Sequence, residues 1–131
     1  MTPAKRPTGL TLDTGALIAI ENRQDIVWDL LLGAERRNIP IRIPAGVLAQ
    51  AWRATARQAP ISRLLAVDNV TVVPLTRERA FEIGRLCRES GHSDVIDVSV
   101  AVCARSHGDS VLTSDPHDIR KVDPQLTLIG I

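Results

Sequence analysis

Residues 9–20 read Gly-Leu-Thr-Leu-Asp-Thr-Gly-Ala-Leu-Ile-Ala-Ile, so that a short apolar run ends at Asp13 and passes into a helix-like stretch. This order of residues predicts a buried strand that is followed directly by a helix. A second apolar run, at 110–114, likewise ends beside an acid, Asp115. The carboxyl ends of parallel strands lie along one edge of an open α/β sheet, and ligands bind there. Asp13 and Asp115 are therefore candidate site residues.

The rest of the chain alternates between segments of strand character and segments of helix character. Strands are predicted over residues 9–13, 39–43, 70–73, 110–113 and 127–131, and helices over residues 14–21, 25–37, about 44–58, 60–67 and 77–89. A further helix is predicted between a cap at Ser93 and a stop at Gly108. Strands that are separated by helices indicate an α/β fold, with about five parallel strands and helices on both faces of the sheet.

Composition limits the class of protein. The chain has 131 residues, of which 44% are hydrophobic and 24% charged, as in a single soluble domain. Its net charge of +1 provides no global basic field, so any contact with RNA or DNA must come from a local patch. Met1–Pro7 leads into no long apolar run, and no segment approaches the ~18 apolar residues of a membrane span, which favours a cytoplasmic protein. Cys87 and Cys103 lie among apolar residues and are expected to be reduced.

One carboxylate in the second half of the chain is unexpected. Asp97 lies one turn inside the largely apolar stretch Val95–Ala104, and Asp94 lies one turn before it. Charged side chains are rarely buried unless they are paired or bound to a metal. The other acids have ordinary explanations. Asp13 could cap the helix that follows it, Asp94 could complement the positive end of its helix, and Asp115 could be a turn or cap residue. Asp97 is therefore the hardest of the four to explain without a site.

Electrostatics favour a cation at a cluster of such acids. Two ionised carboxylates about 4 Å apart repel by about 4 kcal/mol at an effective dielectric constant of about 20. Converging carboxylates therefore take up protons or bind a cation. Oxygen ligands favour Mg²⁺ or Mn²⁺. Zinc is disfavoured, because His92, His107 and His117 have no zinc-like spacing to the cysteines, and His92 is expected at the surface.

These segments resemble the motifs of a known family. Leu-Asp-Thr-Gly-Ala-Leu at 12–17, Asp-Val-Ile-Asp at 94–97 and Val-Leu-Thr-Ser-Asp-Pro at 111–116 look like the motifs of PIN-domain nucleases. Within this family the chain is most similar to the VapC-type ribonuclease toxins. The resemblance covers essentially the whole chain and implies a single PIN-like nuclease domain over 1–131. It also implies a three-layer fold and an acidic site for Mg²⁺ or Mn²⁺.

The resemblance assigns roles to individual residues. Asp13 matches the first acid of the family motif, Asp97 the third and Asp115 the fourth, so these are the implied metal ligands and catalytic residues. The second acid is expected on the proline-led helix in mid-chain, where the matching residue is Gln50. Gln50 brings no charge and cannot act as a base, so Asp94 is included as a candidate substitute.

Contacts with the substrate are expected beside Gln50. With spacings of i, i+3 and i+7, Gln50, Arg53 and Arg57 would share one face of the predicted helix and contact phosphates. A solvated helix face is the ordinary alternative. The hydroxyl of Thr14 is a candidate to orient a water or a phosphate oxygen.

The resemblance implies the toxin of a bacterial toxin–antitoxin pair: a metal-dependent endoribonuclease that hydrolyses RNA phosphodiester bonds. It also implies a homodimer and a small antitoxin as partner. A PIN-like binding module, catalytically impaired by Gln50, is the alternative. A phosphoacceptor signalling domain has a similar fold class, but Pro74-Leu75-Thr76 follows the third predicted strand in place of an acceptor aspartate.

Overall fold

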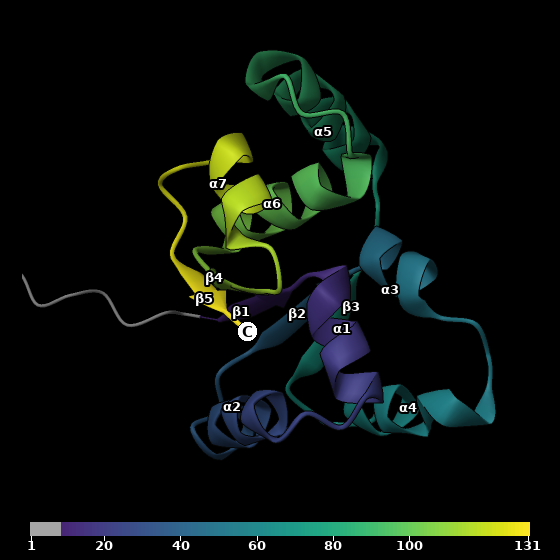
Figure 1. Cartoon of the computed structure of the whole chain (residues 1–131). Coiled ribbons are helices and arrows are strands. Elements are labelled where there is room, and N and C mark those ends of the chain that lie inside the picture. The colour runs from purple at the N-terminus through teal and green to yellow at the C-terminus, as the bar shows by residue number, and fades with distance from the viewer. Residues whose placement is uncertain (1–8) are drawn as a thin grey trace, which may run out of the picture.

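The computed structural model describes residues 9–131, and its centre is a five-stranded sheet with strand order β3-β2-β1-β4-β5 (Figure 1). The strands are β1 (Leu10–Leu12), β2 (Ile41–Pro44), β3 (Val70–Val73), β4 (Ser110–Thr113) and β5 (Leu128–Gly130). Every neighbouring pair is parallel, as the alternation of strands and helices predicts. Residues 1–8, where we expect no signal peptide, lie outside the described part of the chain.

Helices cover both faces of this sheet. They are α1 (Thr14–Glu21), α2 (Asp25–Arg36), α3 (Ala45–Ala51), the short 3₁₀ helix η1 (Ala56–Gln58), α4 (Ala59–Leu65), α5 (Arg77–Ser90), α6 (Val95–His107) and α7 (Pro116–Val122). In Figure 1, α1, α2 and α4 lie on one side of the sheet, and α6 and α7 lie on the other, with α5 outside α6. The predicted three-layer α/β fold is confirmed. Among residues 9–131, no helix combines the length and the apolar character needed to cross a bilayer.

Apolar side chains fill the spaces between the layers. The larger cluster packs the helices onto the sheet around fully buried residues such as Leu12, Leu17 and Ile43. A smaller cluster joins α5, α6 and α7 around Val98 and Ala101. Strands β1 and β4 are buried along their whole length, as central strands of a parallel sheet are when helices cover both faces.

The strand order places a topological switch point at β1. Strand β1 pairs with β2 on one side and with β4 on the other. Helices α1 and α2, which lead to β2, and helix α6, which leads to β4, lie on opposite faces of the sheet (Figure 1). Ligands of open α/β sheets bind at this switch point, outside the carboxyl ends of the strands. Asp13 directly follows β1, and Asp115 follows β4 after Ser114.

The helix predicted over residues 44–58 is shorter than expected. It ends at Ala51, and the chain continues through Ala54, which has a left-handed φ of 58°, to η1. The buried side chain of Gln58 explains the break, because its Nε2 donates to the Ala51 carbonyl over 2.7 Å and its Oε1 accepts from the Arg53 N–H over 2.6 Å. The Gln58 side chain therefore satisfies a carbonyl that the end of the helix leaves unpaired.

Two further expectations need correction near the acids. Asp94, rather than Ser93, caps α6, because its carboxylate accepts from the first free N–H groups of that helix. Helix α7 was not predicted, although Asp115 followed by Pro116 is a helix start signal. Both corrections concern residues beside the candidate site.

Candidate metal centre

Three of the predicted site residues cap helices. Asp13 is the N-cap of α1 and accepts a hydrogen bond from the Ala16 N–H over 2.8 Å. Asp94 caps α6, and Asp115 caps α7. In each case the capping oxygen is Oδ1, which satisfies backbone N–H groups at the start of the helix. The capping roles expected of Asp13 and Asp115 are therefore present, and Asp94 takes the capping role that was expected of Ser93.

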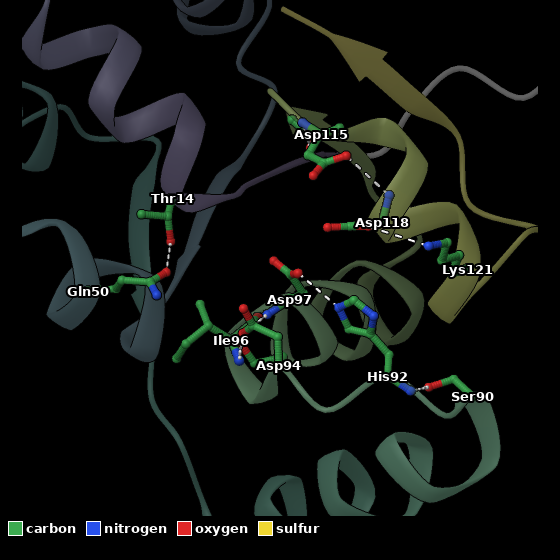
Figure 2. Close-up of polar contacts among 12 residues, drawn as sticks. Thr14, Gln50, Ser90, His92, Asp94, Ile96, Asp97, Asp115, Asp118 and Lys121 are labelled. Atoms are coloured by element: carbon green, nitrogen blue, oxygen red, sulfur yellow. Dashed lines mark hydrogen bonds and ion pairs between the residues drawn. The ribbon is translucent and has the colours of Figure 1, made fainter.

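Helices α6 and α7 begin with the same pattern, Asp-x-x-Asp. It consists of Asp94 and Asp97 in α6, and of Asp115 and Asp118 in α7. In both helices the first aspartate accepts a hydrogen bond from the backbone N–H of the second, over 3.2 Å in α6 and 3.3 Å in α7. The second aspartate of each pair directs its carboxylate toward the space between the two helix starts (Figure 2).

His92 contacts Asp97 and lies near Asp118. It lies on the loop between α5 and α6, and its Nε2 is 3.0 Å from Oδ2 of Asp97. His92, Asp97 and Asp118 each offer one ligand atom, and the three atoms lie within 4.8 Å of one another. We call these three residues the central cluster. Lys121 lies on the outer side of Asp118, 3.9 Å from its Oδ1 and beyond hydrogen-bonding distance (Figure 2).

Burial and shared negative charge raise the pKa of two of the acids. For Asp97, burial is the largest cause, the charges of Asp94 and Asp118 add to it, and the hydrogen bond with His92 opposes it. For Asp13, burial again raises the pKa most, hydrogen bonds from its surroundings oppose the rise, and the charge of Asp97 adds to it. Asp13, Asp94 and Asp118 are thus each electrostatically coupled to Asp97.

Gln50 and Thr14 form a second polar pair near the acids. Gln50 is exposed near the end of α3, and its Oε1 accepts a hydrogen bond from Oγ1 of Thr14 over 2.5 Å. In Figure 2, Asp97 lies between this pair and His92. Because Oε1 already accepts from Thr14, the NH₂ group of Gln50 provides two donors, which suit a phosphate oxygen better than a cation.

Arg53 and Arg57 do not share a helix face with Gln50, so that prediction is wrong. Helix α3 ends before them, and the guanidinium of Arg53 folds back onto two backbone carbonyls at the end of that helix. Arg57 lies in η1 and contacts the end of α1, 3.2 Å from Oδ1 of Asn22 and 4.0 Å from Glu21. Both arginines remain exposed on the same loop region.

Sequence reasoning missed His92 and Asp118. Asp118 could have been found, because its spacing from Asp115 repeats that of the earlier pair on α6. His92 was expected at the surface, yet only 18% of its side chain is exposed. The turn that brings it back to Asp97 depends on Gly91, whose φ of 72° ends α5 in the left-handed region.

The sequence profile of the PIN domain matches residues 10–124. The chain belongs to the PIN domain family. The resemblance stated from the three motifs is thereby confirmed. No curated protein matches the chain by sequence.

Solved structures share the fold of this PIN domain at low sequence identity. One is a chain of VapBC2 from Rickettsia felis, in a crystal structure with a DNA fragment from the VapBC2 promoter. It is 18% identical with a TM-score of 0.71, over 93% of this chain and 98% of that one. A chain of FitAB bound to the IR36 DNA fragment is 14% identical with a TM-score of 0.65, over 92% and 94%. PAE2754 from Pyrobaculum aerophilum is 20% identical with a TM-score of 0.60, over 92% and 83%. At these identities the likeness shows the fold alone.

The donor set of this PIN domain fits a divalent cation. Carboxylate oxygens are the ligands that hard cations prefer. The pKa of Asp13 and of Asp97 is raised first by burial and then by neighbouring negative charge, and a bound cation would offset both effects. Within residues 9–131, the central cluster brings its three ligand atoms close enough to share one ion. Asp94 and Asp115 lie beside it (Figure 2). The structure thus contains a candidate acidic metal-binding cluster.

An apolar cavity of about 300 Å³ adjoins this centre. It lies between α3, α5 and α6, and Val95 and Ile96 of α6 line its edge beside the acids. The side chains of Leu75, Phe81 and Val95 in and around it are more than half exposed. This surface is suited to contact with an apolar partner rather than to phosphate chemistry.

Proposed function

We propose that this PIN domain is a metal-dependent endoribonuclease, the toxin of a bacterial toxin–antitoxin pair, which hydrolyses RNA phosphodiester bonds. The observation that carries the proposal is that three acids lie close enough to Asp97 to interact with its charge, at the switch point of the sheet. They are Asp13 after β1, Asp94 after α5 and Asp118 after β4. Membership of the PIN domain family supports nuclease chemistry, and the similarity to VapBC2 and FitAB supports a toxin. We take residues 1–131 as one nuclease domain.

The acids would hold one or two Mg²⁺ or Mn²⁺ ions, with Asp13, Asp97 and Asp115 as ligands and Asp94 beside them. A bound ion of this kind lowers the pKa of water and offsets the charge that develops on the phosphate. The contribution of the protein is to orient the carboxylates in advance. The caps at Asp94 and Asp115 fix the starts of α6 and α7, and so fix the directions of the acids one turn later.

Thr14 and Gln50 are proposed to position the substrate. The hydrogen bond from Thr14 holds the side-chain oxygen of Gln50, so that its NH₂ group is free to donate to a phosphate oxygen. An uncharged residue at this position also avoids adding repulsion between the protein and RNA.

Arg53 and Arg57 are proposed to contact phosphates farther along the RNA. An acidic centre repels RNA, and the net charge of +1 compensates little, so local basic residues must supply the attraction. Replacing both by Gln should weaken RNA binding across sequences and lower the slope of log K against log salt by roughly 0.7 per lost contact. Replacing Arg36 and Arg37, at the end of α2, is the matched control. An unchanged slope in the Arg53/Arg57 variant would show that this loop faces away from RNA.

The partners proposed for this chain are a second copy of itself and a small antitoxin. The exposed apolar side chains around the cavity provide surface for protein contact. An antitoxin arginine that reaches the acids would compete with metal for the same charge. Co-expression with the neighbouring small reading frame should yield a stable complex without nuclease activity. A chain that is an active monomer by light scattering, and that ignores this product, would contradict the toxin assignment.

A binding module without catalysis is the second candidate. It is favoured by the uncharged Gln50 and by the capping roles of Asp13, Asp94 and Asp115. Incubating purified protein with RNA and Mg²⁺ or Mn²⁺, with and without EDTA, separates the two functions. Chelator-sensitive cleavage supports the nuclease, and RNA binding without cleavage supports the module.

A further inference from the structure

We infer that His92 is a direct nitrogen ligand of the metal centre, together with Asp97 and Asp118. The centre would then prefer Mn²⁺ or a later transition metal ion to Mg²⁺. This inference deepens the proposed function and shares with it the assumption that a divalent ion binds among these acids.

The distances in the central cluster suit shared coordination. Two neighbouring ligands of one six-coordinate ion, each about 2.1 Å from it, are about 3 Å apart, and two opposite ligands are about 4.2 Å apart. Nε2 of His92 and Oδ2 of Asp97 are 3.0 Å apart, and the ligand atom of Asp118 lies within 4.8 Å of both. Small side-chain movements would therefore bring all three atoms to one ion.

Coordination by His92 would also explain how the centre can hold a metal ion with an uncharged residue, Gln50, in place of an acid. Gln50 brings no charge, and its oxygen is engaged by Thr14. His92 approaches Asp97 from the other side (Figure 2), where it can supply the ligand that position 50 does not. A neutral imidazole adds no negative charge to acids that already repel one another.

A nitrogen ligand changes which ion the centre selects. Mg²⁺ is bound almost entirely through oxygen, whereas imidazole suits transition metal ions, whose affinities rise from Mn²⁺ to Co²⁺ and beyond. A centre of two carboxylates and one imidazole should therefore bind Mn²⁺ and Co²⁺ more tightly than Mg²⁺.

The alternative role for His92 is to position Asp97 through a hydrogen bond. His92→Gln separates the two roles, because a Gln side chain can still donate to Asp97 but offers no imidazole nitrogen. The matched control is His117→Gln, which changes an exposed histidine of α7 outside the central cluster. Circular dichroism of the metal-free variants checks that each one folds.

The experiment titrates metal-free protein with Mg²⁺, Mn²⁺ or Co²⁺ alone by calorimetry and records the visible absorption spectrum of the Co²⁺ form. We expect His92→Gln to weaken Mn²⁺ and Co²⁺ binding by at least about tenfold, to change Mg²⁺ binding little, and to alter the Co²⁺ spectrum. His117→Gln should match the parent, and Asp118→Asn should weaken all three ions.

An unchanged Co²⁺ spectrum and unchanged affinities in His92→Gln would overturn the inference, as would a parent protein that binds none of these ions. Because no RNA is present, this result is independent of cleavage. If the parent cleaves RNA in a chelator-sensitive way and His92→Gln binds metal as the parent does, the His92 inference is refuted and the proposed nuclease is not. Metal binding through His92 without any RNA cleavage would support the inference and refute the nuclease.

Discussion

Asp97→Asn should stabilise the metal-free protein and abolish most of the stabilisation that metal provides. Asp97 is coupled to Asp13, Asp94 and Asp118, and burial raises its pKa. Its negative charge therefore opposes folding when no cation is bound. Asparagine removes the charge and keeps an oxygen that can accept a hydrogen bond from His92.

The size of the effect follows from the separation of the charges. The carboxylates of Asp97 and Asp118 lie within 4.8 Å, so they repel by about 3.5 kcal/mol at a dielectric constant of about 20 and by about 0.9 kcal/mol in bulk water. Because both side chains are partly exposed, solvent screens this repulsion. We therefore expect Asp97→Asn to raise the free energy of unfolding of the metal-free protein by about 1 kcal/mol, which corresponds to about 3–5 °C in Tm. At an ion concentration of about 100 Kd, metal should stabilise the parent by about 2.7 kcal/mol.

Thermal unfolding followed by circular dichroism measures both effects. The protein is stripped of metal and titrated with MgCl₂ or MnCl₂ at constant ionic strength and at a pH near 8. Asp29→Asn, at an exposed position on α2, is the control and should respond to metal as the parent does. Equal stabilisation by metal in Asp97→Asn and the parent, or a lower Tm of the metal-free variant, would refute the reasoning.

Three other perturbations test neighbouring parts of the structure. Gln50→Glu should tighten Mg²⁺ binding and lower the stability of the metal-free protein, because it adds a negative charge near the acids; an unchanged calorimetric affinity would remove position 50 from the site. Burial raises the pKa of Asp13 and Asp97, so the folded state binds protons there more tightly than the unfolded chain. The contribution of these groups to stability therefore falls as the pH rises from the usual Asp pKa through the raised values. The advantage of Asp97→Asn over the parent in urea titrations should accordingly shrink toward acid pH, and an advantage that is constant with pH would contradict the assigned shift. Arg42→Ala should lower the free energy of unfolding by about 3–5 kcal/mol, because the fully buried Asp109 carboxylate loses its ion pair at 2.6 Å; a urea midpoint equal to that of the parent would show that the pair is dispensable.

The sheet could be predicted from the sequence because its signals are local. Short apolar runs bounded by acids or prolines are typical of strands, and the helices between them favour parallel pairing. The same local logic placed Asp13 and Asp115 at the carboxyl ends of β1 and β4. It also identified Asp97, since an acid inside an apolar helix needs a partner.

The remaining features depend on side-chain contacts and turns that no local sequence pattern specifies. Helix α3 ends where the Gln58 side chain reaches back to its last turn, which no local pattern reveals. The proximity of Asp118 to Asp97 depends on how α7 packs against α6, and the position of His92 depends on the turn at Gly91. The central cluster is therefore a product of tertiary packing, although each of its residues is visible in the sequence.

RNA cleavage by purified protein tests the nuclease assignment most directly. A panel of defined, end-labelled RNAs is incubated with Mg²⁺ or Mn²⁺, and the fragments are mapped. We expect internal cleavage that EDTA stops and excess Mn²⁺ restores, that Asp97→Asn abolishes and that Asp29→Asn leaves intact. RNA that stays uncut by metal-loaded protein, or cleavage that persists in EDTA or in Asp97→Asn, would contradict a metal-dependent ribonuclease built on these acids.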